Sequence, residues 1–180
     1  YEFLNSQKFD LESASNELKG IISEMDDIMV DKFKKSFESI KQEFSKIFKL
    51  MFKGGKGELA LSDPDDLLNT GIDILAIPPG KKINSPVSLS GGEKALTAIC
   101  LLFAMLEVKP SPFVILDEAE AALDEVNVDM FGKYLSEEKN RSQFIVITHK
   151  KRMMEYADSL YGITMQESGV SKIVSAKLEN

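Results

Sequence analysis

The sequence predicts an α/β fold in which a mainly parallel sheet is flanked by helices and preceded by one long helix. Residues 11–52 contain no proline and space their apolar residues as a helix does. Residues 113–116 and 144–147 are short, fully apolar runs, which are typical of strands buried on both faces. Helical patterns separate these runs, and strands that alternate with helices favour parallel pairing.

The composition is that of an ordinary globular domain and argues against several other classes. The 180 residues are 43% hydrophobic and 28% charged, and a chain of this length can bury a sizeable core. A net charge of -7 argues against a uniformly basic surface, so DNA would be met by a local basic patch or another subunit. Cys100 is the only cysteine, which favours a reducing cytoplasm. We expect neither a signal peptide nor a membrane span.

The long helix is the first predicted element, and it ends near residue 52. Its apolar residues recur about every 3.7 positions, which fits a straight helix better than a left-handed coiled coil. They are Leu18, Ile22, Met25, Met29, Phe33, Phe37, Ile40, Phe44, Phe48 and Met51. Two interpretations stay open: a surface helix packed on a core, or the continuation of a coiled-coil arm. We divide the chain into residues 1–52, the arm end and long helix, and residues 53–180.

The remaining elements follow in order. Period-two alternation predicts two strands at residues 59–61 and 72–77, with a turn at 62–66 between them and another at 78–82. A helix is predicted over residues 91–107, closed by Pro110 and Pro112. Beyond it we expect strands at 113–116, 144–147, 160–165 and 172–177, with helices at 126–135 and 152–156.

Ser90, Gly91 and Gly92 form the first candidate site, immediately before the helix over residues 91–107. The free N–H groups and the positive dipole end of a helix can hold an anion there, and glycines let the backbone approach it. Ser90 either caps the helix or donates its hydroxyl to a phosphate oxygen. An ordinary N-cap is the alternative.

Asp117 and Glu118 form the second candidate site, because they follow an apolar strand directly. Ligands of open α/β sheets bind at this carboxyl edge. We expect Asp117 to hold Mg²⁺ through water and Glu118 to orient and deprotonate an attacking water. A solvated acidic loop is the alternative.

His149, the only histidine, follows the strand at residues 144–147. A neutral imidazole there would reach a terminal phosphate or polarise its water, although a structural histidine is the alternative. Asp124 lies between the second and third sites. It is expected either to begin a helix as its N-cap or to face a nucleotide across an interface.

In this order and spacing the segments resemble the ATP-binding-cassette ATPases and, within them, the structural-maintenance-of-chromosomes (SMC) family. The resemblance is carried by residues 89–96 (LSGGEKAL), 112–124 (PFVILDEAEAALD) and 147–151 (ITHKK). Residues 161–172 (YGITMQESGVSK) are similar to the end of the bacterial-type SMC protein, so the resemblance covers essentially the whole chain.

The resemblance implies part of an ATPase head that acts on ATP with Mg²⁺. The roles it assigns are the signature motif for Ser90, Gly91 and Gly92, the Walker B pair for Asp117 and Glu118, the D-loop for Asp124 and the switch histidine for His149. Two such heads sandwich two ATP molecules, and each signature motif contacts the γ-phosphate bound to the opposite head. The implied partners are a second head in an ATP-dependent homodimer, the winged-helix domain of a kleisin beyond about Tyr161, and DNA through the full complex. The resemblance also implies that the protein is cytoplasmic and associated with the nucleoid.

One departure from the family pattern concerns the phosphate-binding loop. The string Gly-x-x-x-x-Gly-Lys-Ser/Thr is absent, because Gly57 follows Lys56 and Lys82 follows Lys81. The resemblance therefore implies the C-terminal lobe of a head whose N-terminal Walker A lobe lies elsewhere in the same protein. We expect the chain alone neither to bind ATP tightly nor to hydrolyse it.

Three alternatives stay open at this stage. A transporter ATPase subunit shares the motifs but needs no long leading helix, and its signature usually ends in Gln rather than Glu93. A coiled-coil ATPase of double-strand-break repair also has a split head. A module for dimerisation and kleisin docking would carry the same motifs without turnover.

Overall fold

The computed structural model describes residues 1–80, 89–167 and 169–177. The elements are α1 (Glu2–Met51), β1 (Lys56–Leu61), β2 (Ile72–Ile77), α2 (Gly91–Val108), β3 (Phe113–Asp117), α3 (Glu125–Glu138), β4 (Gln143–Ile147), α4 (Lys151–Met154), β5 (Ser159–Glu167) and β6 (Val170–Lys177). Every helix and strand expected from the sequence is present, and the long helix is a single element. Of the turn predicted at residues 78–82, residues 81 and 82 lie outside the described part.

The strands form three separate two-stranded sheets, so the expectation of one mainly parallel sheet is wrong for the described residues. Only β3 and β4 pair in parallel, whereas β1–β2 and β5–β6 are antiparallel. The reason lies in the connections. A helical crossover, α3, joins β3 to β4 and lets both strands run the same way, whereas no helix separates the strands of the other two pairs.

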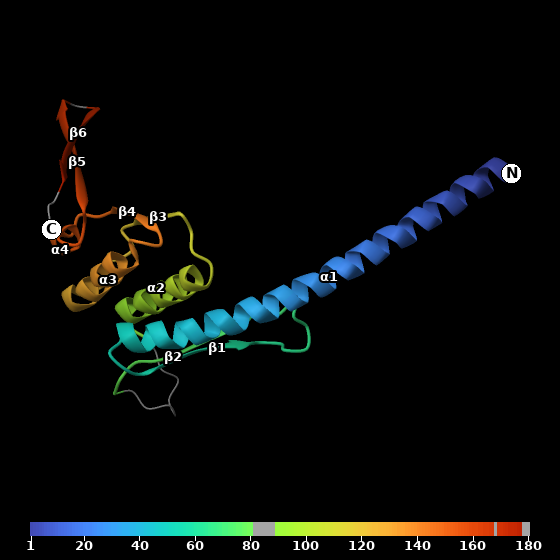
Figure 1. The fold of residues 1–180 in the computed structure, drawn as a ribbon, viewed down its shortest axis with the longest axis horizontal. Helices are drawn as coiled ribbons and strands as arrows, with labels where there is room; N and C mark the ends of the chain where they lie inside the picture. The colour runs from blue at the N-terminus through green and yellow to red at the C-terminus, as the bar shows by residue number, and fades with distance from the viewer. Residues whose placement is uncertain (81–88, 168, 178–180) are drawn as a thin grey trace.

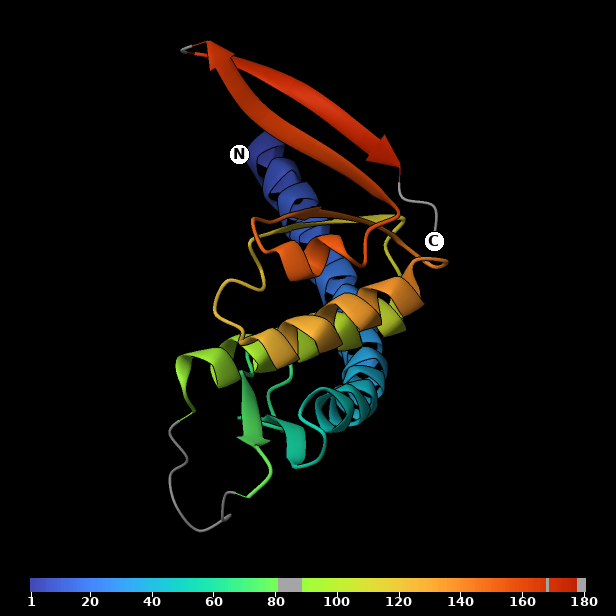
Figure 2. The ribbon, with the colours of Figure 1, turned by 90° about the vertical axis from the view of Figure 1, so that its left-hand side faces the viewer.

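The core lies where the last turns of α1 meet α2 and α3 (Figures 1 and 2). Phe44, Phe48, Phe103 and Phe131 are fully buried, and each contributes roughly 1.5–3 kcal/mol through burial. The rings of Phe103 and Phe131 stack with centroids 5.6 Å apart, which joins α2 to α3. The C-terminal end of α1 is therefore part of the globular region.

The N-terminal half of α1 projects away from the rest of the molecule (Figure 1). The buried residues of α1 begin only at Phe37; Phe33 packs against the core while partly buried, and the apolar side chains from Phe3 to Met29 are exposed. None of the described helices combines the length and the apolar content that crossing a membrane requires.

The β3–β4 pair is covered on one face only, which corrects the expectation of strands buried on both faces. Leu116 is buried and Val146 packs against the core. On the opposite face of the two strands, the side chains of Phe113, Ile115 and Ile147 are 55%, 58% and 52% exposed. Side chains alternate across a strand, so these three residues belong to one uncovered apolar face.

Candidate functional site

The carboxyl ends of β3 and β4 bring the acidic pair and the histidine to one edge of the parallel sheet. Asp117 ends β3 and pairs in register with Ile147, which ends β4. Glu118 and His149 follow on the two connections that leave this edge. Parallel pairing is therefore what places residues from two distant segments together, at the edge where open α/β folds bind ligands.

Glu118 and His149 contact one another directly. The imidazole Nδ1 lies 3.2 Å from Glu118 Oε1, and the two side chains are 72% and 56% exposed for His149 and Glu118 respectively. The pair is therefore open to a ligand that arrives from outside. It combines a carboxylate, which accepts a proton, with an imidazole, which both accepts and donates hydrogen bonds.

The backbone of Glu118 is held in an uncommon conformation, with φ at +46°. Its N–H donates to the carbonyl oxygen of Ile147 over 2.9 Å, and its own carbonyl accepts from the N–H of Ala121 at 2.9 Å. The left-handed conformation costs a non-glycine residue roughly 1–2 kcal/mol. Such strain persists where the surrounding hydrogen bonds fix it, and it concentrates at functional sites.

The Asp117 carboxylate is exposed at the end of β3, and no described side chain bonds to it. The described residues contain no cluster of three or more His, Cys, Asp or Glu side chains that would hold a metal by themselves. One available carboxylate fits Mg²⁺, which takes one or two protein carboxylates and completes its shell with water and substrate phosphates.

Ser90 closes the N-terminus of α2 in a capping box with Glu93. Its Oγ accepts from the N–H of Glu93 at 3.3 Å, while its own N–H donates to Glu93 Oε2 at 2.7 Å. Because the hydroxyl oxygen only accepts in this arrangement, its proton can still be donated to an anion. The cap and the phosphate-donor roles expected for Ser90 are therefore compatible.

The two glycines at this helix end have different surroundings. A Cβ on Gly91 would have no heavy atom within 4 Å, so the backbone there is open to an incoming group. A Cβ on Gly92 would lie 3.0 Å from the carbonyl oxygen of Ala122. Gly92 thus lets the start of α2 pack closely on the segment that leads to Asp124.

Asp124 caps α3, because its Oδ1 accepts from the N–H of Asn127 at 2.8 Å. The structure therefore forms two local groupings: Glu118 with His149, and the Ser90–Gly92 turn with the segment before Asp124. No hydrogen bond or ion pair within the described ranges joins the Ser90–Gly92 turn to Glu118 or His149. A direct link between the Ser90–Gly92 turn and Glu118 or His149 would therefore have to be made by a bound ligand.

Sequence reasoning missed Glu120, Thr148 and Lys150, which bond to one another beside the site. Glu120 is only 1% exposed, although it is ionisable. An acidic residue among Ala119, Ala121 and Ala122 was the available signal, because small apolar neighbours indicate a tightly packed segment. Lys150 belongs to a basic cluster with Lys151 and Arg152, and such a run by itself indicates only a solvated face.

Arg152, from the same basic cluster, is bound to α3. Its Nη2 donates to Asp129 Oδ2 at 2.9 Å, and its Nε donates to Oδ1. Hydrogen bonding to Arg152 is the main cause that lowers the pKa of the Asp129 carboxyl, with a further contribution from Tyr156. Arg152 is therefore engaged within the fold.

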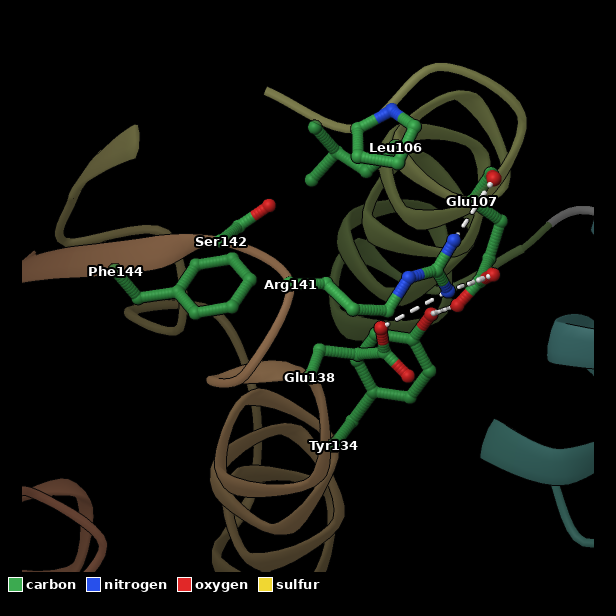
Figure 3. Close-up of a pocket in the computed structure, with 8 residues that line it drawn as sticks. Leu106, Glu107, Tyr134, Glu138, Arg141, Ser142 and Phe144 are labelled. Atoms are coloured by element: carbon green, nitrogen blue, oxygen red, sulfur yellow. Dashed lines mark hydrogen bonds and ion pairs between the residues drawn. The ribbon is translucent and has the colours of Figure 1, made fainter. Parts of the chain in front are cut away.

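A small cavity lies at the other end of α2 and does not coincide with the candidate site (Figure 3). Its volume of about 10 Å³ is roughly the space of one water molecule. Arg141 bridges Glu107 and Glu138 along its wall, and the Tyr134 hydroxyl donates to Glu107 at 3.2 Å. Burial is the main cause that raises the pKa of Glu138. The network ties α2 to α3.

Residues 2–172 match the family model described as RecF/RecN/SMC N terminal domain. Over 99% of its length the chain is 55% identical to the chromosome partition protein Smc of Bacillus subtilis (strain 168). One solved chain is 40% identical, with a TM-score of 0.74 over 82% of this chain and 89% of that one. Its structure is described as structural biochemistry of ATP-driven dimerization and DNA stimulated activation of SMC ATPases. The Smc head domain of Pyrococcus furiosus, with an extended coiled coil and bound to the C-terminal domain of ScpA, is 39% identical, with a TM-score of 0.77 over 98% of this chain and 44% of that one.

The chain spans 15% of the length of the Bacillus subtilis relative. The matching family model is described as an N-terminal domain, whereas the sequence had led us to expect the C-terminal half of a head. That expectation is not confirmed. It depended on the motifs present in the chain, and these motifs do not themselves give its place in a longer polypeptide.

Proposed function

The chain belongs to the RecF/RecN/SMC N terminal domain family and has the mixed α/β fold of SMC ATPase heads, and from this premise we propose that it supplies the hydrolytic half of an ATP site. Its contributions are a signature motif, a Walker B pair, a D-loop and a switch histidine. The observation that carries the proposal is the 3.2 Å contact between His149 and Glu118 at the carboxyl edge of β3–β4.

Glu118 acts as the general base for hydrolysis. It accepts a proton from a water molecule whose oxygen bonds to the γ-phosphorus of ATP, while the bond from that phosphorus to the bridging oxygen breaks and releases ADP. Proton acceptance by a positioned carboxylate typically contributes about 10²–10⁴ in rate. His149, in contact with Glu118, polarises the same water or the terminal phosphate. Their exposure leaves room for the nucleotide to approach.

Asp117 is the residue that would hold the magnesium ion accompanying ATP, through a water molecule. Its single exposed carboxylate suits an ion that draws its remaining ligands from phosphate oxygens and water. When bound, the ion would neutralise negative charge on the phosphates during transfer.

The Ser90–Gly92 turn and Asp124 act on ATP held by a second head. Ser90 keeps its hydroxyl proton, Gly91 leaves the helix end open, and the α2 dipole favours an anion at this point. Among the described residues no hydrogen bond joins the Ser90–Gly92 turn to Glu118 or His149, which suits contacts with two different nucleotides. The related solved chain comes from work on ATP-driven dimerization of SMC ATPases. Hydrolysis by Glu118 would remove the γ-phosphate that bridges two heads and release the dimer.

A second lobe completes the head by supplying the phosphate-binding loop that this sequence lacks. The uncovered apolar face of β3–β4, which includes Phe113, Ile115 and Ile147, supports this proposal. Large contiguous apolar patches mark interaction sites on soluble proteins. We place the boundary between arm and lobe near residue 52, with the last turns of α1 packed into the lobe's core.

The β5–β6 hairpin is the proposed docking surface for a kleisin. It projects from the rest of the molecule (Figure 2), and Tyr161, Ile163 and Ile173 on it are exposed. The related Pyrococcus furiosus head is bound to the C-terminal domain of ScpA. Within such a complex the protein would act on DNA in the chromosome partition process for which its bacterial relatives are named.

The test is ATP turnover after this chain is mixed with the lobe that carries the phosphate loop. Activity is expected in the mixture only, and Glu118→Gln is expected to abolish it while ATP-dependent dimers accumulate. Glu137→Gln makes the same chemical change on the exposed side of α3 and should leave turnover unchanged. Normal hydrolysis by Glu118→Gln would overturn the catalytic assignment and favour a docking module without turnover.

A further inference from the structure

We propose that Glu120, Thr148 and Lys150, here called the clamp, are positioning residues that hold the His149 turn in a fixed relation to residues 121–124. This inference deepens the proposed ATPase site and rests on it. The role assigned to the clamp residues requires no contact with the nucleotide or with the attacking water. They set where His149 and the segment before Asp124 lie.

Thr148 is the centre of the clamp. Its hydroxyl donates to Glu120 Oε1 and accepts from the N–H of Lys150 at 3.0 Å. One hydroxyl thus anchors the backbone on both sides of His149 to the loop that follows β3. The imidazole itself is largely exposed and gains its position from this turn.

The side chain of Lys150 binds the loop that follows β3. Its Nζ donates to the carbonyl oxygens of Glu120 at 2.7 Å and Leu123 at 2.8 Å, and to that of Ala121 at 3.3 Å. The three protons of the ammonium group are therefore all donated to carbonyl oxygens of one loop. Loss of this side chain would remove the bonds that hold the carbonyl groups of residues 120, 121 and 123 to the segment after β4.

Glu120 carries the strongest indication that the clamp serves more than stability. It is 1% exposed, and its Oε2 is buried without a hydrogen-bond partner among the described residues. A buried polar atom without a partner is costly, and an apolar side chain of similar size is often at least as stable in such a place. The presence of a carboxylate at this buried position is explained if its bond to Thr148 sets the geometry of the site.

The clamp lies between the two local groupings of site residues. On one side, Ala122 packs against Gly92 at the start of α2. On the other side, His149 contacts Glu118. A displacement of residues 121–124 by a second head would therefore be transmitted through Thr148 to His149. The clamp would couple arrival of the opposite head to the position of the histidine.

The test uses the full-length protein and compares Thr148→Val with Thr148→Ser. Valine keeps the shape of threonine and removes the hydroxyl, whereas serine keeps the hydroxyl. We expect Thr148→Val to lower kcat roughly 10- to 100-fold, since small misplacement of a catalytic group has this effect, with KM for ATP within about twofold of the parent value. Thr148→Ser should restore most of kcat.

Ser142→Ala is the matched control for a lost hydroxyl. The Ser142 hydroxyl donates to the carbonyl oxygen of Ser111 at 2.6 Å and joins the same two strands at their opposite end. Its removal should leave kcat unchanged. A second variant, Lys150→Met, should lower kcat in the same way as Thr148→Val, whereas Lys151→Met should not.

The outcomes separate this inference from the proposed function. If Glu118→Gln abolishes turnover but Thr148→Val and Lys150→Met match the parent, the clamp is overturned and the ATPase assignment stands. Equal losses in Ser142→Ala and Thr148→Val also overturn it, because a general structural effect would then explain both. If Glu118→Gln hydrolyses ATP normally, the proposed function fails first.

Discussion

Nδ1 of His149 lies 3.2 Å from Oε1 of Glu118, although 31 positions separate the two residues in the chain. The parallel pairing of β3 with β4 brings them together, because it sets Asp117 opposite Ile147 at the same edge. A carboxylate and an imidazole in contact, both open to solvent, are suited to handling a water molecule beside a phosphate.

His149→Ala should lower ATP turnover by the assembled head about 10²-fold, the low end of the range for a group that assists proton transfer. ATP binding should persist, because the histidine acts on the water or the terminal phosphate and not on the rest of the nucleotide. Single-turnover hydrolysis, measured beside equilibrium ATP binding, checks this. Loss of binding with an unchanged hydrolysis step would contradict the assigned role.

Replacement of Glu118 should separate stability from activity. At φ +46° glycine is favoured over alanine, so Glu118→Gly should be more stable than Glu118→Ala by about 1 kcal/mol. Neither variant should hydrolyse ATP, because both lack the carboxylate. Urea unfolding of the two variants checks the order of stability, and a more stable alanine variant would show that the strain is absent.

Variants at Ser90 should distinguish helix capping from phosphate binding. Ser90→Ala removes the capping acceptor and should cost about 1 kcal/mol of unfolding free energy. Ser90→Asp keeps a capping acceptor, so stability should remain near the parent value. It also places a negative charge at the proposed γ-phosphate position, so ATP-dependent dimers should be lost. Dimer formation by Ser90→Asp at the parent level would refute the phosphate contact.

The uncovered face of β3–β4 predicts a specific loss of lobe assembly. Ile115 is 58% exposed, so Ile115→Ser should change the stability of this chain by less than about 0.5 kcal/mol. The same change should weaken complementation by the phosphate-loop lobe. Val126→Ser, at a side chain 57% exposed on α3, is the matched control and should assemble normally. Equal assembly by both variants would place the lobe contact elsewhere.

The ion pair between Arg152 and Asp129 predicts a pH dependence of stability. Because Arg152 lowers the pKa of Asp129 in the folded state, the pair stabilises the fold above the ordinary carboxyl value of 3.8. This contribution is lost as the pH falls through the lowered folded pKa. Asp129→Asn should therefore reduce Tm at pH 7 and change Tm little at a pH below the lowered pKa of Asp129.

Arg152→Gln provides the control through a double-mutant cycle. In that background Asp129→Asn should change the pH dependence of Tm much less, because the main partner that lowers the pKa of Asp129 is gone. An unchanged effect would mean that another group, such as the Tyr156 hydroxyl 3.1 Å from Asp129 Oδ1, is responsible.

Local signals in the sequence were sufficient for the elements and for several site residues. The glycines after Ser90 and the helical spacing behind them predicted a helix over 91–107, and α2 spans Gly91–Val108. Helix capping was one of the two roles that the sequence left open for Ser90, and the cap observed is a capping box, which depends only on neighbours three residues apart. The catalytic and nucleotide-binding roles remain predictions that the experiments above address.

Burial was the least predictable property. The apolar run from Phe113 to Leu116 was expected to be covered on both faces, yet only the alternation that includes Leu116 is. Hydrophobicity states which side chains favour burial, but the presence of a covering element depends on the rest of the assembly. The burial of Glu120 was missed for a related reason, since its environment is created by Thr148 and Lys150 from a distant segment.

The sequence by itself determined the order of helices and strands and the residue types at the candidate site, because backbone propensity, capping and periodicity act over a few neighbouring residues. Only the tertiary structure decided which strands pair, which face of β3–β4 stays open and that Glu118 meets His149. These features depend on contacts between segments far apart in the chain. Such contacts form only when the core around Phe48 and Phe103 brings α1 and α2 together with the elements that follow them.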